Sequence, residues 1–360
     1  MMRTRVGIIC GGPSTEHAVS LISAVNIVAA IDRARFEVIV IGVDDNGGWH
    51  HYPPDAFVTD ANDPARIALQ PSTNRLHLNP GATSGVLIDS ASGQAIDPID
   101  VFFPIIHGTS GEDGGLQGLL RWLNTPFVGT DIAGSAMAMD KDIAKRLLSA
   151  AGLATAPYRA LSHADSANAD FDALAEQLGT PLFIKPANQG SSVGVSRVTS
   201  KTAFKPALDN ALALDHKVLV ETAVTGREIE CAVLGNEHPE VSGCGEIVLT
   251  DGFYSYETKY LDAEAAGVVV PADLPENVAE TVRNVAATAF KALNLAGLAR
   301  VDVFVTSDER VIVNEVNTLP GFTPISMYPK LFEHAGIGYE ALVTRLIEQA
   351  CTRFSATATP

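Results

Sequence analysis

Residues 300–317 carry side chains whose types and spacing suit a divalent metal ion. The segment resembles two β-strands, because apolar and polar residues alternate, and residues 306–310 between them have the composition of a hairpin turn. An antiparallel pair would bring together two carboxylates, an amide oxygen and a guanidinium. Oxygen ligands of this kind, without Cys or His, suit Mg²⁺ held against phosphates. The residues that alternation places on the converging faces are Arg300, Asp302, Glu315 and Asn317.

This hairpin has two interpretations. In the first, it is a half-solvated hairpin with ordinary surface polar residues, and Asp302 taken alone favours that interpretation. In the second, it is a metal site, and the four residues together favour it because an arginine lies beside the acids. We therefore predict a metal-binding hairpin.

The composition limits the classes to which the protein can belong. A chain of 360 residues is too long for one typical domain, and 46% hydrophobic residues suffice for several cores. The net charge of −17 argues against nucleic acid or an anionic membrane as a partner, but it does not forbid a local basic pocket for a nucleotide. The first apolar run is too short for a signal peptide, and none approaches the ~18 residues that span a bilayer. The four cysteines show no metal-type spacing and imply no disulfide framework, so we expect a soluble, cytoplasmic protein with reduced thiols.

The first domain, predicted over residues 1–129, begins with a strand-helix-strand pattern. An apolar strand at residues 6–9 leads into a turn-rich loop, residues 19–31 are helical, and residues 36–43 return as a buried strand. This order predicts a doubly wound parallel sheet. A later strand, at residues 100–106, ends in a loop that begins with His107, where such sheets bind ligands. Between these strands, residues 44–97 are rich in Pro, Asn, Asp and Ser, with one short strand expected at residues 85–89.

A second unit is predicted over residues 130–223 and a third over residues 224–353, followed by a disordered tail at residues 354–360. Asp140 caps a helix that Gly152 ends. The other elements expected in these units are a strand at 182–186, a Gly/Ser-rich loop at 188–194, a return strand at 195–198, a helix at 203–215, and strands at 218–221 and 228–234.

Motifs typical of many nucleotide-binding proteins are absent, and one hydrolase motif occurs in the wrong structural context. No G-x-G-x-x-G follows the first strand, and no G-x-x-x-x-G-K-[ST] occurs. Gly190-Ser-Ser192-Val-Gly194 satisfies G-x-S-x-G, the nucleophile elbow of α/β-hydrolases. That elbow needs a helix directly after the serine, whereas residues 193–198 have strand character. A Gly/Ser loop between strands instead offers N–H groups and hydroxyls to a polyphosphate.

The order of lysines, Gly/Ser loop, acids and hairpin resembles the ATP-grasp superfamily, and matches at both ends narrow the resemblance to the D-alanine–D-alanine ligases. The matches cover the chain from residue 6 to about residue 350. The motifs are Gly11-Gly-x-Ser-x-Glu16-x-x-Val-Ser20, His107-Gly-x-x-Gly-Glu-Asp-Gly114, Met139-Asp-Lys141, Lys185-Pro-x-x-x-Gly-Ser191-Ser-Val-Gly194, Lys259-Tyr260, Arg300-Val-Asp302 and Glu315-Val-Asn317-Thr-x-Pro-Gly321. The resemblance implies an α/β fold: an N-terminal doubly wound parallel-sheet domain followed by the two α+β subdomains of an ATP-grasp fold.

The implied reaction joins two D-alanine molecules at the expense of ATP, through a D-alanyl phosphate, for peptidoglycan precursors. Glu16 would pair with the ammonium of the first D-alanine, and His107 would orient that substrate, although a lone histidine here is more often a satisfied core residue. Ser191, linked to Tyr260, would assist deprotonation of the second amine. Ser326 would bind the second carboxylate, beside Met327.

The same resemblance implies the nucleotide and metal residues. Arg300 and the Gly321 N–H would face the tetrahedral oxyanion. Asp302, Glu315 and Asn317 would hold two Mg²⁺, for which Mn²⁺ would substitute. The residues expected at the nucleotide are Lys141 and Lys185 (α- and β-phosphates), Lys259 (γ-phosphate), Glu221 (adenine edge), Glu228 (ribose), Ser191, Ser192 and Asn314. Many family members carry a lysine where this chain has Thr222.

Three further expectations complete the sequence prediction. Residues 251–271 have little regular pattern and are predicted to form a lid that carries Lys259 and Tyr260. The family suggests a homodimer formed through the first domain. The alternative functions are a D-alanine–D-lactate ligase and a catalytically silent ATP-grasp binding protein, although none of the residues whose loss would indicate the latter is lost.

Overall fold

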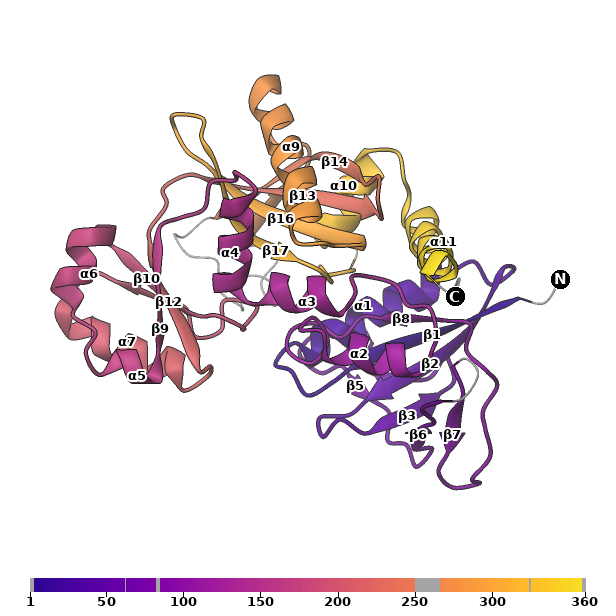
Figure 1. Ribbon diagram of the computed structural model, residues 1–360. Helices are drawn as coiled ribbons and strands as arrows, with labels where there is room; N and C mark the ends of the chain where they lie inside the picture. Colours follow the sequence, from indigo (N-terminus) through magenta and orange to yellow (C-terminus); the bar gives the residue numbers. More distant parts are fainter. Residues whose placement is uncertain (1–2, 62, 82–84, 250–265, 324, 358–360) are drawn as a thin grey trace.

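The computed structural model describes residues 3–61, 63–81, 85–249, 266–323 and 325–357. In these residues the chain forms three main sheets, each covered by helices, that meet around one junction (Figure 1). The sheet orders are β3-β2-β1-β8, β11-β10-β12-β9 and β15-β14-β13-β16-β17. The fold class predicted from the sequence is therefore confirmed.

The first sheet is parallel except at its edge. Strands β1 (Thr4–Gly11), β2 (Phe36–Val43) and β8 (Val101–Pro104) run parallel, and β3 (Trp49–Tyr52) is antiparallel to β2. The parallel strands are apolar along almost their whole length because both faces of the sheet are covered. Helices α1 (His17–Ala30) and α11 (Tyr339–Thr357) pack on one face and α2 (Gly115–Trp122) on the other. Helix α11, which follows the third sheet in the chain, thus packs against the first domain.

Between β2 and β8 the chain forms more strands than the sequence predicts. The expected strand is present as β7 (Leu87–Asp89), which pairs with β6 (Leu76–Leu78). Beside these lie β3 and a two-stranded pair of β4 (Val58–Thr59) with β5 (Ala68–Leu69). Strands of two to four residues are too short for alternation to be recognised, so this part of the prediction missed them.

The second sheet is antiparallel throughout. Its strands are β9 (Tyr158–Ser162), β10 (Leu182–Pro186), β11 (Ser196–Val198) and β12 (Lys217–Thr222). Its helices are α5 (His163–Ser166), α6 (Phe171–Leu178) and α7 (Lys201–Leu212), and α3 (Ile132–Met139) and α4 (Lys141–Ala150) precede it. Because β11 rather than a helix follows the serines of the Gly/Ser loop, the nucleophile-elbow reading is excluded.

The third sheet carries the predicted hairpin. Its strands are β13 (Arg227–Gly235), β14 (Glu240–Leu249), β15 (Ala266–Val269), β16 (Gly297–Val305) and β17 (Val311–Asn317). Helix α9 (Glu276–Ala292) covers one face and α10 (Met327–His334) the other. In the antiparallel register, Arg300 lies opposite Asn317 and Asp302 opposite Glu315, so the convergence predicted from alternation is confirmed.

One prediction about the carboxyl end is wrong. Residues 354–357 belong to α11 instead of a disordered tail. The helix continues because its last turns contact the first domain. Arg353 donates to the carbonyl oxygens of Gly129 and Phe127 at 2.7 and 3.1 Å, and the Phe354 ring lies against Arg121. The Ser, Thr and Ala residues that predominate after Phe354 give no sign of these contacts in the sequence.

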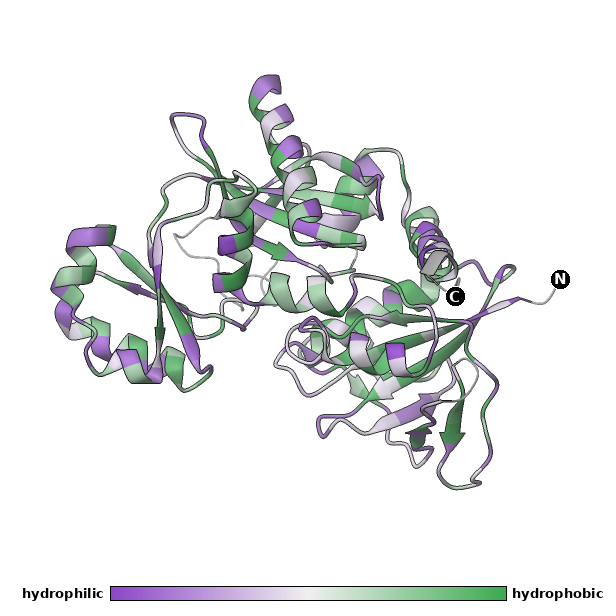
Figure 2. Cartoon of the chain, viewed as in Figure 1, coloured by the Kyte–Doolittle hydropathy of each residue, from purple (hydrophilic) through white to green (hydrophobic). Residues whose placement is uncertain are grey.

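The distribution of hydropathy follows the layers. Apolar residues fill the strands of all three sheets, and helices such as α4 and α9 carry one apolar and one polar face (Figure 2). In the part of the chain that the structure describes, no helix combines the length and the apolar character needed to cross a membrane.

Asp140, between α3 and α4, generates a prediction about stability. Its carboxylate accepts hydrogen bonds from the N–H groups of Asp142 and Ile143 at 3.0 and 3.1 Å, and Lys217 Nζ lies 2.7 Å away. Asp140→Ala should lower the free energy of unfolding by about 0.5–2 kcal/mol, because the helix loses its N-cap. Urea denaturation measures this loss. Asp140→Asn, which can still cap, should lose less; equal stability of the Ala variant and the unmutated protein would contradict the cap.

Candidate active site

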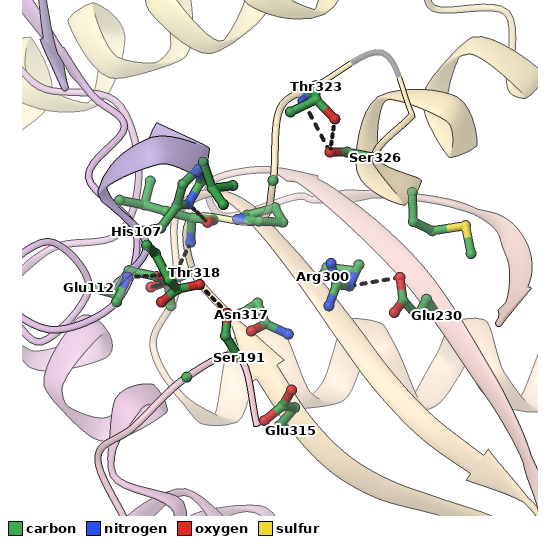
Figure 3. A pocket seen from close by; sticks show the side chains of 18 of the residues that line it. His107, Glu112, Ser191, Glu230, Arg300, Glu315, Asn317, Thr318, Thr323 and Ser326 are labelled. Carbon is green, nitrogen blue, oxygen red and sulfur yellow. Dashed lines mark hydrogen bonds and ion pairs between the residues drawn. The ribbon is translucent and has the colours of Figure 1, made fainter. Parts of the chain in front are cut away.

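A cavity of ≈ 490 Å³ lies where the three units meet, and polar side chains from each unit line it (Figure 3). The first domain contributes the ends of the loops after β1 and β8, the second contributes the start of α4 and the Gly/Ser loop (residues 188–194), and the third contributes the hairpin and the segment after it. The sequence-predicted residues that line it are Glu16, His107, Lys141, Ser191, Arg300, Glu315, Asn317, Gly321, Ser326 and Met327.

Glu16 and Ser191 join the first domain to the Gly/Ser loop. Ser191 Oγ donates a hydrogen bond to Glu16 Oε1 at 2.5 Å, and both side chains are buried. Ser191 and Ser192 have φ values of +49° and +58°, in the left-handed region that residues with side chains seldom adopt. Strain of this kind persists where the surrounding structure enforces it, most often at functional sites.

Two glycines make room for the Glu16 carboxylate. A Cβ added to Gly108 would lie 2.5 Å from Glu16 Oε2, and one added to Gly190 would lie 3.0 Å from the same oxygen. The carboxylate is therefore enclosed between the loop after β8 and the Gly/Ser loop. The Glu16 carboxylate can take this position only because neither Gly108 nor Gly190 has a side chain.

His107 contacts the segment that follows the hairpin. Its Nδ1 is 2.8 Å from the carbonyl oxygen of Leu319, and its Nε2 is 3.0 Å from Ser23 Oγ. Burial lowers the pKa of His107, so the ring is neutral near neutral pH. Because a carbonyl only accepts, the proton lies on Nδ1 and Nε2 accepts from Ser23. The side chain lines the cavity and is also fully satisfied.

Glu112 is a site residue that the sequence prediction missed. It lines the cavity, and its two oxygens accept from the N–H groups of Gly108 and Leu319, each at 2.9 Å. Burial, and then the negative charge of Glu16, raises the pKa of Glu112 to about 7. The sequence could have pointed to Glu112, because it lies within the 107–114 motif that matches the family.

The hairpin holds its polar side chains through a dense set of contacts. Arg300 Nε and Nη2 donate to the two oxygens of Asp302, both at 2.7 Å, and Asn317 Nδ2 donates to Asp302 Oδ2 at 2.9 Å. Asp302 is buried beneath these partners. Glu315 is more exposed toward the cavity, where Lys141 Nζ lies 3.9 Å from its Oε2.

Glu230, on the neighbouring strand β13, is a second residue that sequence reasoning missed. It is buried, lines the cavity, and its Oε2 is 2.9 Å from Arg300 Nε (Figure 3). It also lies opposite Asp302 in the β13–β16 register. Arg300 is therefore held by one carboxylate on its own strand and another on the adjacent strand. Only the pairing of β13 with β16 reveals this contact.

The segment after the hairpin brings a hydroxyl close to a glycine. Ser326 Oγ accepts from the Thr323 N–H at 3.0 Å and lies 2.8 Å from the Thr323 hydroxyl. A Cβ on Gly321 would be 2.9 Å from Ser326 Oγ. Gly321 and Ser326 thus lie side by side at the cavity, with Met327 at the start of α10.

Lys185 and Glu221 form an ion pair in the second sheet. Lys185 Nζ donates to Glu221 Oε1 at 2.9 Å, and Lys145 Nζ lies 2.8 Å from Glu221 Oε2. All three side chains are buried. Lys145, which the sequence prediction did not include, lies one helical turn after Lys141 on α4. Thr222 follows Glu221 and donates to the carbonyl oxygen of Leu178 at 2.8 Å.

Not every predicted residue lies at the cavity wall formed by the described residues. Asn314 is the extra residue of a bulge where the β16–β17 register shifts after Asp302. The predicted residues that do not line the wall are Lys185, Ser192, Glu221, Glu228, Asp302 and Asn314. Lys259, Tyr260 and the greater part of the predicted lid at residues 251–271 lie outside the described residues.

The donor set that the sequence predicts for a metal ion consists of two carboxylates and an amide. Across the described ranges, no cluster of three or more His, Cys, Asp or Glu side chains is arranged to hold a metal ion. Asp302, Glu315 and Asn317 nevertheless adjoin one another in the register of the hairpin. Asn317 donates its amide N–H to Asp302, and its amide oxygen is the kind of donor atom that a hard cation prefers.

Comparison with known families gives matches over nearly the whole chain. The family described as "D-ala D-ala ligase N-terminus" matches residues 5–130, and "D-ala D-ala ligase C-terminus" matches residues 147–348. The two matches coincide with the first domain and with the region that contains the second and third sheets.

Individual relatives agree with these matches. The chain is 58% identical over 350 residues to a "D-alanine--D-alanine ligase A" of Chromobacterium violaceum, covering 97% of this chain and 96% of the relative. The solved D-alanine-D-alanine ligase of Coxiella burnetii is similar at a TM-score of 0.85 and 35% identity, covering 99% and 96%. The VanG D-Ala:D-Ser ligase of Enterococcus faecalis is similar at a TM-score of 0.85 and 32% identity, covering 97% and 100%.

Gly190 provides a test of the Glu16–Ser191 contact. Gly190→Ala should lower turnover by about 10²-fold, because the new Cβ would press on the Glu16 carboxylate and displace the reacting groups. Steady-state kinetics measures the effect. The matched control is Gly243→Ala, where an added Cβ meets no atom within 4 Å. Similar turnover in both variants would show that the close approach of Gly190 to Glu16 is not required.

Proposed function

The chain belongs to the D-alanine–D-alanine ligase family, and we therefore propose that it joins two D-alanine molecules to D-alanyl-D-alanine while ATP is converted to ADP and phosphate. The product serves peptidoglycan precursor synthesis. The observation that carries the proposal is the convergence of Glu16, Ser191, Arg300, Glu315 and Asn317 on one cavity. These residues come from three separate units, and a silent nucleotide-binding protein would not need them together.

In the first step, the carboxylate of the first D-alanine attacks the γ-phosphorus of ATP and forms D-alanyl phosphate and ADP. Glu16 suits the substrate ammonium, because its buried carboxylate carries the opposite charge at the cavity wall. His107 is neutral and adds no competing positive charge beside it. Lys141 would bind phosphate oxygens from the start of α4, because its ammonium lies at the cavity wall.

In the second step, the amino group of the second D-alanine attacks the acyl carbon, and phosphate leaves. The incoming ammonium must first lose a proton. The Ser191–Glu16 hydrogen bond supports a path for it, since Ser191 can accept from the amine while it donates to Glu16. Arg300, held by Asp302 and Glu230, would stabilise the negative charge on the tetrahedral oxygen, with the Gly321 N–H as a second donor. Ser326 would bind the carboxylate of the second substrate.

We assign the divalent metal to Asp302, Glu315 and Asn317, which offer the hard oxygen donors that Mg²⁺ prefers. When bound, Mg²⁺ would neutralise charge on the phosphates. Arg300 and Lys141 lie beside the same acids, and they would orient the carboxylates. We propose that two ions bind and that Mn²⁺ would substitute for Mg²⁺. The protein would be a cytoplasmic homodimer.

The nucleotide residues form the remaining part of the proposal. Lys185 would bind phosphates, and Glu221 and Glu228 would contact adenine and ribose. Lys259 would reach the γ-phosphate from the proposed lid. Ser192 and Asn314 complete the proposed nucleotide contacts.

The reaction is tested by its products. ATP, Mg²⁺ and the protein should release phosphate rapidly only when D-alanine is present, with one D-alanyl-D-alanine formed for each phosphate. A coupled phosphate assay and mass spectrometry measure the two products. Nucleotide binding without dipeptide would favour a silent binding protein, and D-alanyl-D-lactate as the main product with both acceptors present would favour a D-alanine–D-lactate ligase.

Glu315 gives the sharpest prediction about the metal. Glu315→Gln should abolish turnover and leave the fold intact, because a neutral amide would not supply the negative charge with which Glu315 would hold Mg²⁺. Circular dichroism checks the fold, and phosphate release at saturating Mg²⁺ checks the activity. Turnover equal to that of the unmutated protein would contradict the metal assignment.

The acceptor specificity gives a further prediction, which depends on Tyr260. A site for D-lactate must accept a hydroxyl in place of an ammonium of nearly equal size, and packing alone separates such molecules poorly. We expect dipeptide as the dominant product from about pH 7 upward, because Ser191 and Tyr260 would accept and orient the amine. Tyr260→Phe should raise the share of D-alanyl-D-lactate, most clearly near pH 6. Mass spectrometry with both acceptors at equal concentration measures that share; an unchanged share would contradict the role of Tyr260.

A further inference from the structure

Lys145 is a buried lysine that the reaction above does not use. Its side chain is 2% exposed, and its ammonium lies 2.8 Å from Glu221 Oε2 and 3.5 Å from the carbonyl oxygen of Ala156. The Tyr158 ring lies beneath it, with Nζ 5.6 Å from the ring centre. A lysine in such surroundings is held there by a specific interaction, because burial of an unpaired ammonium is costly.

Glu221 divides its two oxygens between two lysines. Oε1 accepts a hydrogen bond from Lys185 at 2.9 Å, and Oε2 forms an ion pair with Lys145 at 2.8 Å. Two buried cations thus share one anion, so the group carries an excess positive charge. That excess suits an additional anion near Lys185. Lys145 itself does not line the cavity, and it acts through Glu221.

The surroundings of Lys145 bring its pKa close to neutral pH, so its charge can change within the pH range of the experiment. Burial lowers the pKa of Lys145 to about 8, Glu221 opposes that shift, and Lys185 and Lys141 add to it. The groups that face the ammonium are Glu221 from β12, Lys185 from β10, Lys141 from its own helix and the Tyr158 ring from β9.

We propose that Lys145 is a positioning residue of the nucleotide site, which anchors Glu221 so that Lys185 can exchange its carboxylate partner for a phosphate of ATP. The inference rests on the proposed function, because it takes Lys185 and Glu221 as nucleotide residues. Without Lys145, the Lys185 ammonium would remain the sole partner of a buried carboxylate. Each phosphate contact by Lys185 would then leave Glu221 unpaired.

This arrangement makes nucleotide binding depend on pH. A bound polyphosphate raises the pKa of Lys145, because the added negative charge favours the ammonium. The bound state therefore holds the proton more tightly than the free state. Affinity for ATP is highest below the pKa of the free protein, about 8, and falls as pH rises through it. At pH 8 binding is accompanied by uptake of a fraction of a proton.

The first experiment compares ATP binding by calorimetry, with Mg²⁺ and without D-alanine, so that no turnover occurs. Lys145→Met keeps a side chain of similar volume and should raise the Kd for ATP by about tenfold or more, in the range of a lost hydrogen bond to a charged group. Lys205→Met is the matched control, because it removes a lysine from an exposed i,i+4 pair on α7. An unchanged Kd in folded Lys145→Met would overturn the proposal.

The second experiment measures the Kd for ATP from about pH 7.5 to about pH 9.5, where ATP itself is fully ionised. The unmutated protein should lose affinity above about pH 8, by up to about tenfold per pH unit, and Lys145→Arg should lose this dependence because arginine stays charged. Calorimetry of ATP binding in buffers of different ionisation enthalpy gives the number of protons taken up. This measurement uses the unmutated protein alone. Absent uptake, or an unchanged pH dependence in Lys145→Arg, would overturn the proposal. ATP binding without dipeptide synthesis would instead contradict the proposed function.

Discussion

Both backbone polar groups of Leu319, just after the β16–β17 hairpin, are bound by side chains of the first domain. Its N–H donates to Glu112, and its carbonyl accepts from His107. Buried backbone groups must be paired, so these two hydrogen bonds hold the segment after the hairpin against the loop after β8. The same loop leaves room for Glu16 at Gly108, and Glu16 binds Ser191 of the Gly/Ser loop. The cavity is thus a product of contacts between units, and no single sheet could form it.

The charges around the cavity are balanced by pairing instead of by exposure to water. Arg300 lies between Asp302 and Glu230, and Glu221 lies between Lys185 and Lys145. The first group holds a guanidinium at the cavity wall, and the second carries an excess positive charge. Charged groups fixed in advance, in surroundings with little water, stabilise a transition state without reorganising. The overall negative charge of the chain therefore says little about the chemistry of its centre.

The sequence predicts those parts of the site that depend on local order. Alternation is sufficient to predict that Asp302 and Glu315 meet across the hairpin, since neighbouring strands have a side-chain period of two. It cannot predict the contact between Lys145 and Glu221, because the two residues lie on different elements and only packing brings them together. The pairing of Glu230 with Arg300 was missed for the same reason, because it requires the order of strands in the sheet. Family resemblance supplied roles for many residues, but it gave no account of the contacts that hold them.

The proposed reaction activates a carboxylate by phosphoryl transfer at this junction. The most direct test uses D-alanine labelled with ¹⁸O in its carboxylate, together with ATP and Mg²⁺. If an acyl phosphate forms, its carbon–oxygen bond breaks when the second amine attacks, and one ¹⁸O passes from D-alanine into each inorganic phosphate released with dipeptide. Mass spectrometry of the phosphate should therefore show one labelled oxygen for each D-alanyl-D-alanine formed. Dipeptide formed together with unlabelled phosphate would contradict the account.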